Sequence, residues 1–210
     1  MKKTRPLIII TASLAIIISL SAFLKMPDNG TGENLLTDEL YEIIMDGDII
    51  CILGNRPWSG ILRDLSEKER LYSHAGIIRI RDDRVTVIHA EGNTGHGRNY
   101  VNEIPLKDFL DSAVNVGIYR AREIKGSSIS DLSLEYIGIP FDWGFDMTDP
   151  SRLYCTELVY EIFRHLVPEF NFNTIYVKEL GMDIIPLDSS SGSEFFSGIY
   201  YSEGYVNPDM

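Results

Sequence analysis

Cysteine is scarce in this sequence of 210 residues: only Cys51 and Cys155 are present, too few for a disulfide framework. Basic residues are also in short supply, with 19 Lys and Arg against 31 Asp and Glu, a formal net charge of −12. Binding to a nucleic-acid backbone depends mainly on clustered Lys and Arg, so the sequence argues against a nucleic-acid partner. No glycine repeat suggests a fibre, and the apolar content of 44% is enough for a globular core.

Motifs for metals and nucleotides are missing as well. The sequence has no C-x-x-C, no H-E-x-x-H and no His/Cys cluster at the spacing of metal ligands. It also lacks a glycine-rich nucleotide fingerprint and the G-x-S-x-G turn of serine hydrolases. We therefore expect neither a metal nor a cofactor.

The first 25 residues have the pattern of an export segment. Lys2, Lys3 and Arg5 precede 19 uncharged residues, 6–24. A basic stretch before an apolar run is typical of a signal peptide or an N-terminal membrane anchor, and a length near the ~20 residues of a membrane span fits both. The sequence thus predicts an exported, extracytoplasmic protein, secreted or anchored, whose membrane contact is confined to this segment.

Residues 26–36 are predicted to form a linker, and residues 37–210 a single domain. Without residues 1–25 the chain has 15 basic and 31 acidic residues, a net charge of −16. Such a domain accommodates cationic or neutral substrates more easily than anionic ones.

Hydrophobic patterning predicts an α+β fold. The expected strands are 48–53, 74–81, 84–90 and 114–120, with 74–81 and 84–90 forming a hairpin around Asp82-Asp83. The expected helices are 37–45, 127–137 and 155–167, the last with one continuous apolar stripe. The aromatic tail, residues 195–205, is expected to pack onto the domain.

Cys155 stands out because it begins the strongest predicted helix. A thiol at a helix N-terminus meets free backbone N–H groups and the positive end of the helix dipole, so we expect its pKa to be lowered. The same N–H groups can stabilise an oxyanion, as acyl transfer requires. Cys51 lies in an apolar strand and is predicted to be a core residue, although a Cys51–Cys155 disulfide is chemically possible outside the cytoplasm.

His74 and His89 are expected to be neighbours at one end of the hairpin. His74 begins the first strand and is followed by the small residues Ala75 and Gly76, which permit close approach of another group. His89 ends the partner strand, on the same face as Val85 and Val87, which we take as the core-facing one. A base oriented by a third polar group is the arrangement that a nucleophilic cysteine needs.

Four segments together resemble the permuted papain-like family of the YaeF/YiiX group, related to the NlpC-type cell-wall peptidases. They are Gly47-Asp48-Ile49-Ile50, Ser73-His74-Ala75-Gly76-Ile77, Pro140-Phe141-Asp142-Trp143 and Tyr154-Cys155-Thr156-Glu157-Leu158-Val159. The histidine strand precedes the cysteine helix, which is the permuted order. The resemblance implies a circularly permuted papain-like (NlpC-type) fold, with a central antiparallel sheet packed against the helix that carries the nucleophile.

The resemblance also implies roles for individual residues. Cys155 matches the nucleophile and His74 the general base. His89 lies where such families place a third polar residue that orients the base, and Glu91, two residues on, is the alternative. Permuted relatives often have Glu at this place, whereas His89-Ala90 is closer to the unpermuted enzymes.

Four further residues are candidates for substrate contact: Tyr154, Trp58, His96 and Trp143. Tyr154 directly precedes Cys155, His96 lies in a glycine-containing loop, and the two tryptophans are candidate pocket walls, although buried aromatics are more often core residues.

The sequence thus leads to the hypothesis of an exported cysteine peptidase or amidase. It would cleave a peptide, γ-glutamyl or lysyl amide through an acyl-enzyme, with peptidoglycan as a possible partner. Two alternatives stay open: a lipid-directed acyltransferase or acyl hydrolase on the same site, and a binding module without catalysis.

Overall fold

The computed structural model describes residues 35–56, 58–66, 68–92, 98–178, 181–191 and 193–202. The predicted export segment, most of the linker, His96 and the last residues of the tail lie outside these ranges. No helix within the described ranges is long and apolar enough to span a membrane.

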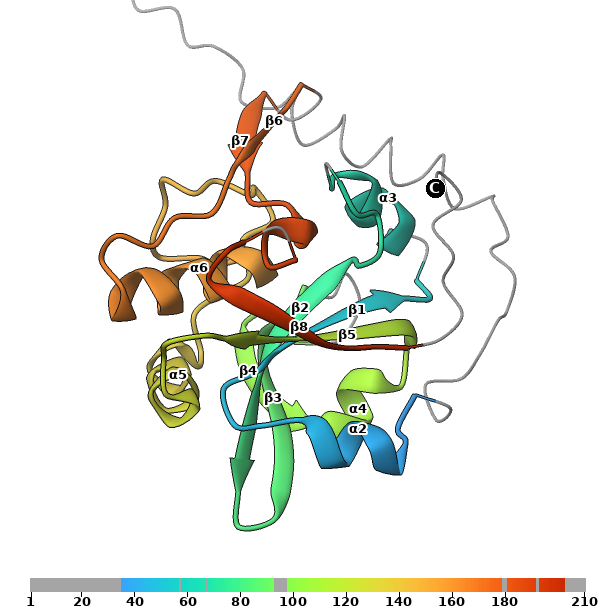
Figure 1. Ribbon diagram of the computed structural model, residues 1–210. Coiled ribbons are helices and arrows are strands. Elements are labelled where there is room, and N and C mark those ends of the chain that lie inside the picture. The colour runs from blue at the N-terminus through green and yellow to red at the C-terminus, as the bar shows by residue number, and fades with distance from the viewer. Residues whose placement is uncertain are drawn as a thin grey trace, which may run out of the picture.

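A six-stranded antiparallel sheet forms the centre of the domain, in the order β4-β3-β2-β1-β5-β8 (Figure 1). The strands are β1 (Ile49–Gly54), β2 (His74–Arg81), β3 (Arg84–Ala90), β4 (Val101–Pro105), β5 (Ala113–Ala121) and β8 (Phe196–Tyr201). A separate two-stranded ribbon joins β6 (Ile175–Val177) and β7 (Met182–Ile184). The α+β class and the hairpin are confirmed, and the aromatic tail contributes the edge strand β8.

Helices cover both faces of the sheet. On one face lie α5 (Gly126–Ser133), the 3₁₀ turn η2 (Leu134–Tyr136) and α6 (Cys155–Leu166); on the other lie α2 (Asp38–Ile43) and α4 (Leu106–Leu110) (Figure 1). Two further elements, α3 (Ser59–Asp64) and the 3₁₀ turn η3 (Leu187–Ser189), belong to the connections. Every residue of β1 is buried, which explains its unbroken apolar run.

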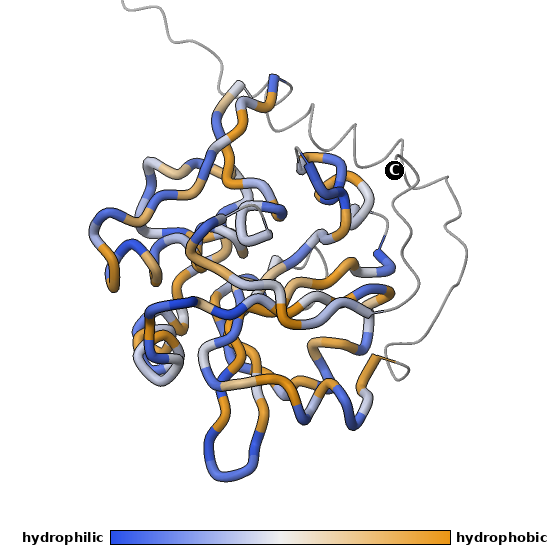
Figure 2. Tube along the Cα trace, viewed as in Figure 1, coloured by the Kyte–Doolittle hydropathy of each residue, from blue (hydrophilic) through white to orange (hydrophobic). Residues whose placement is uncertain are grey.

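Local signals in the sequence explain several boundaries. Thr37 caps α2, since its hydroxyl accepts a hydrogen bond from the backbone N–H of Leu40 at 3.1 Å. Asp82 and Asp83 adopt φ values of 49° and 60°, the left-handed pair that a two-residue hairpin turn requires. The tip of this hairpin is polar and projects away from the apolar layers (Figure 2).

The predicted elements agree closely with the observed ones, but several segments were not anticipated, among them β4, α4, α3 and the ribbon of β6 and β7. Strand β4 and helix α4 come from a segment without clear periodicity, and α3 follows Trp58. Helix α4 matters for the site because Phe109 lies on it.

A buried ion pair ties β5 to the start of β1. Arg120 donates to Asp48 through Nε and Nη2, both at 2.7 Å, and through Nη2 to the carbonyl of Ile43 at 2.7 Å. Asp48 is 1% exposed and also accepts the N–H of Met45. The carboxylate is therefore buried and depends on these donors.

We expect Arg120→Met to lower the free energy of unfolding by about 2–4 kcal/mol, because it leaves the Asp48 carboxylate buried without its cation. Urea unfolding measures the change. The matched control is Arg164→Met, whose partner Glu161 forms a more exposed pair, with an expected loss below about 1 kcal/mol. Equal losses in the two variants would contradict the assignment.

Candidate active site

Helix α6 begins at Cys155 because the chain changes direction at Tyr154, which is extended with φ −94° and ψ 174°. Glu157 accepts the N–H of Tyr154 at 3.3 Å and so closes the first turn. The predicted apolar stripe is buried against the sheet, through Leu158, Val159, Ile162 and Phe163.

The sulfur of Cys155 sits among backbone N–H groups. It accepts hydrogen bonds from the N–H groups of Ala75, Thr156 and Cys155 itself, and each lowers the thiol pKa. Burial outweighs them: Cys155 is 6% exposed, and its pKa is raised to about 11. The expectation of a lowered pKa was wrong for this state of the protein, because the sequence reveals the helix start but not the apolar surroundings of the sulfur.

His74 and His89 form a hydrogen-bonded pair. Nε2 of His74 lies 2.8 Å from Nδ1 of His89, and both rings pack on Phe109 of α4, at centroid distances of 5.5 and 5.1 Å. Nδ1 of His74 has no hydrogen-bond partner among the described residues. The predicted proximity of the two histidines is confirmed.

Burial keeps both imidazoles neutral. It lowers the pKa of His74 to about 4, with a further contribution from the charge of Arg56. The pKa of His89 is also well below its usual value, because of burial first and then His74 and Arg98. At neutral pH the site therefore holds a neutral thiol and two neutral imidazoles.

Cys155 and His74 approach each other at the first residues of β2. The sulfur contacts the N–H of Ala75. Because Ala75 directly follows His74, this contact places the sulfur next to the backbone of His74. The side chain of Ala75 packs on the α6 side of the sheet, whereas the ring of His74 packs on Phe109. No hydrogen bond joins the thiol to the imidazole of these two described residues in this state.

Gly76 makes room for the histidine pair. A β-carbon at this position would lie 2.5 Å from Cγ1 of Val87 and 3.1 Å from Cβ of His89. The small residues after His74 thus accommodate the side chains of the neighbouring strand.

Of the two candidates for the third residue, His89 is the one that contacts His74. Glu91 instead accepts a hydrogen bond from Nδ2 of Asn102 at 3.4 Å. Asn102 lies on β4 opposite His89, is buried, and accepts Nη1 of Arg98 at 2.9 Å. No pattern in the sequence pointed to Asn102, because β4 was not anticipated.

The candidates for substrate contact differ in their surroundings. Tyr154 is buried, and its hydroxyl accepts the N–H of Ile185 at 2.9 Å. Trp143 is 41% exposed and packs on Phe141, while the guanidinium of Arg56 lies 5.5 Å from the ring of Trp58. His96 lies outside the described residues.

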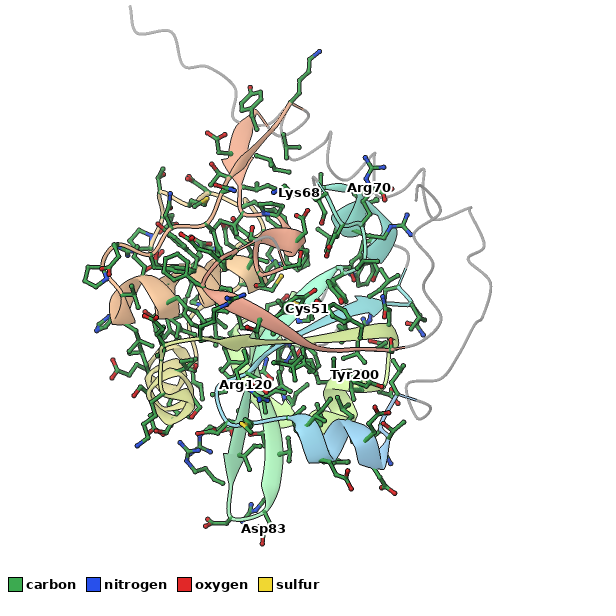
Figure 3. All side chains as sticks on the ribbon, in the orientation of Figure 1. Cys51, Lys68, Arg70, Asp83, Arg120 and Tyr200 are labelled. Atoms are coloured by element: carbon green, nitrogen blue, oxygen red, sulfur yellow. The ribbon has the colours of Figure 1, made fainter. Side chains whose placement is uncertain are left out.

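Cys51 is a buried core residue on β1, as predicted, and both cysteines are free thiols (Figure 3 labels Cys51). Across the described ranges, no group of three or more His, Cys, Asp and Glu side chains could hold a metal ion.

Glu157, in the first turn of α6, is a buried acid. Burial raises its pKa to about 8, and nearby Asp142, Glu161 and Asp146 add to the shift, whereas the N–H of Tyr154 opposes it. Since its folded pKa exceeds the unfolded value, the stability that Glu157 contributes is present below about pH 4.5 and is lost as the pH rises through 8.

We therefore expect Glu157→Gln to gain stability relative to the wild type between pH 4.5 and 8, by on the order of a few kcal/mol. Gln keeps an acceptor for the N–H of Tyr154 and cannot ionise. Urea unfolding at pH 5 and pH 8 measures the difference. A difference between variant and wild type that is the same at both pH values would refute it.

Three comparisons relate this geometry to known proteins. A family model described as permuted papain-like amidase enzyme, YaeF/YiiX, matches residues 44–183. A crystal structure described as the metalloprotein YiiX from Escherichia coli O157:H7 has a TM-score of 0.64 and 16% identity, covering 76% of this chain and 98% of that one. This likeness shows the fold. No curated protein matches the chain.

The order of the elements agrees with the family match, since β2 with His74 precedes α6 with Cys155 around an antiparallel sheet. The family is one of papain-like amidases, so the chain has the fold of a papain-like hydrolase. Because the match spans about two thirds of its length, the chain belongs to the permuted papain-like amidase family of the YaeF/YiiX type.

Proposed function

We propose that this protein is a cysteine hydrolase that cleaves an amide bond through an acyl-enzyme on Cys155. The observation that carries the proposal is the position of the sulfur, at the first residue of α6 and against the backbone of His74-Ala75, together with the pairing of the His74 imidazole with His89. Nucleophile, base and orienting group thus lie at one end of the hairpin.

The first step is attack of the sulfur on the substrate carbonyl. His74 accepts the thiol proton on Nδ1, the nitrogen that has no partner among the described residues, and a C–S bond forms. Because the resting thiol and imidazole are both neutral, the proton moves once the substrate is in place rather than beforehand. His74 must turn toward the sulfur for this transfer, and contacts of this kind often tighten only when substrate is bound.

The backbone N–H groups of Cys155 and Thr156 are suited to stabilise the oxyanion. In the resting state they point at the sulfur. Once the sulfur is bonded to carbon it is a weaker acceptor, and the carbonyl oxygen that becomes negative lies next to the same N–H groups. His74 then protonates the leaving amine, and water hydrolyses the thioester, with its proton passing through His74.

His89 acts as the positioning residue for the base. If Nε2–H of His74 donates to Nδ1 of His89, the lone pair of His74 is left on Nδ1, where the thiol proton must go. This is the third role predicted from the sequence, here assigned to His89 in preference to Glu91.

The proposed substrate is a peptide, γ-glutamyl or lysyl amide outside the cytoplasm, with cell-wall peptide as one class. The family of amidases and the export pattern of residues 1–25 support this choice, and so does the shortage of basic residues. Peptidoglycan is the corresponding partner.

The test is to incubate the full chain with short peptide amides, including γ-glutamyl and N-ε-lysyl amides, and in parallel with phospholipid vesicles. Mass spectrometry identifies the products. Release of amine and free acid from an amide supports the proposal. Acyl transfer or hydrolysis confined to the lipid would overturn it in favour of a lipid enzyme, and binding of amides without any product would indicate a binding module.

A further inference from the structure

A second polar site lies at η3, where two buried polar atoms have no hydrogen-bond partner among the described residues. They are Oδ1 of Asp188 and the hydroxyl oxygen of Ser189. Asp188 is 5% exposed and lies on η3, next to Ser189. Buried polar atoms are nearly always paired, so two unpaired atoms on adjacent residues point to a missing partner.

The other carboxylate oxygen of Asp188, Oδ2, already accepts two hydrogen bonds. The donors are the backbone N–H groups of Lys68 at 2.6 Å and Glu69 at 3.1 Å. These bonds hold the segment that precedes β2 against η3. Asp188 makes no ion pair with any described residue. A buried carboxylate without a cation is costly, so Oδ1 is an acceptor for a positive group from outside.

A cavity of about 350 Å³ adjoins this carboxylate. Its polar lining includes Lys68, Asn171, Asn173, Asp188, Ser189 and Glu194. The volume is at the lower end of the range of small-molecule sites, enough for one amino-acid-sized group. Two carboxylates against one lysine make the lining acidic, in keeping with the acidic balance of the chain.

Hydrogen bonds connect a residue next to the cavity, Ile185, with the two residues that flank Cys155. Ile185 donates its N–H to the hydroxyl of Tyr154 at 2.9 Å, and its carbonyl accepts the hydroxyl of Thr156 at 2.7 Å. These two residues flank Cys155, and Pro186, the residue after Ile185, lines the cavity. A group held in the cavity is thereby fixed relative to the sulfur.

We propose that this cavity binds a primary ammonium group of the substrate. An ammonium group has N–H donors and a positive charge, which suit the carboxylate oxygen of Asp188 and the hydroxyl of Ser189, both left without partners among the described residues. The site makes the preferred substrate an amide that also carries a free primary amine. This consequence for catalysis rests on the proposed function, but binding of the ammonium group does not.

The test uses n-butylamine, protonated at pH 7, and 1-butanol as its neutral analogue. Their affinities for the full chain are measured by isothermal titration calorimetry in phosphate, because Tris is itself a primary amine. We expect the amine to bind at least about tenfold more tightly than the alcohol. Equal affinities in the wild type would overturn the proposal.

Asp188→Asn is the decisive variant. Its amide oxygen can still accept the N–H groups of Lys68 and Glu69, while an NH₂ group replaces the free oxygen and removes the charge. We expect it to lose the preference for the amine. The matched control is Asp83→Asn at the hairpin tip, at the opposite end of the molecule from Lys68 (Figure 3), which should keep the preference. Unchanged amine binding in a folded Asp188→Asn would overturn the proposal.

Ser189→Ala provides a second variant if Asp188→Asn unfolds, since the Ser189 hydroxyl makes no hydrogen bond within the described residues. We expect it to weaken amine binding several-fold and to leave 1-butanol unaffected; wild-type amine affinity would contradict the site.

Amine titration of Cys155→Ala separates this inference from the proposed function. We expect amine binding to persist in this variant. Amine binding without any Cys155-dependent hydrolysis would refute only the proposed function, and hydrolysis without amine preference would refute only the cavity.

Discussion

Replacing Cys155 by alanine is expected to abolish amide hydrolysis, with kcat/KM lowered by about 10³-fold or more. The thiol forms the covalent bond to the acyl group, and Cys51, the other described cysteine, lies on β1 rather than on α6. Steady-state release of amine from the substrate found in the screen measures the effect. Alanine leaves the helix and its N–H groups in place, so binding of the substrate should survive.

The matched control is Cys51→Ala. Cys51 is the other buried free thiol, on β1, and has no part in the proposed chemistry. We expect this variant to lose some stability and to keep its turnover. Hydrolysis that persists in Cys155→Ala, or that disappears in a folded Cys51→Ala, would contradict the assignment of the nucleophile.

The second large effect concerns His74. We expect His74→Ala to lower kcat/KM by about 10²- to 10⁴-fold, the usual contribution of a general acid–base residue. In the wild type, kcat/KM should fall on acidification near pH 4 rather than near 6.5, because burial lowers the pKa of this imidazole to about 4. Only the neutral imidazole can accept the thiol proton, so activity persists down to the folded pKa.

His165→Ala is the control for this variant, since His165 is exposed in the last turn of α6. It should keep both the rate and the pH profile of the wild type. An acidic limb near pH 6.5 in the wild type, or a His74→Ala variant with full activity, would show that His74 is not the base.

Regular patterning made most of the fold predictable. The hairpin over 74–90 followed from two β-rich runs around Asp82-Asp83, and α6 followed from a single apolar stripe, because both patterns are local in sequence. Strand β4 and helix α4 were not predictable in the same way. Their short segments have no period of their own and are held by pairing with β3 and by burial of Phe109 beneath the histidines.

The proximity of His74 and His89 was predictable from the sequence, whereas the electrostatics of the candidate site was not. The position of Cys155 at a helix start was correct, but the apolar surroundings that raise its pKa come from residues distant in sequence. For the same reason nothing in the sequence marked Asn102 behind His89, or Asp188 beneath the cavity. The surroundings of each residue form only when strands and loops from separate parts of the chain come together.

The most direct test of the central claim is to locate the acyl group after a single turnover. The full chain is mixed with an amide substrate, quenched in acid, digested with pepsin and analysed by mass spectrometry. The proposed mechanism predicts the acyl mass on the peptide that contains Cys155 and none on the peptide that contains Cys51. Complete hydrolysis with no acylated Cys155 at any time, and the same rate in Cys155→Ala, would contradict it.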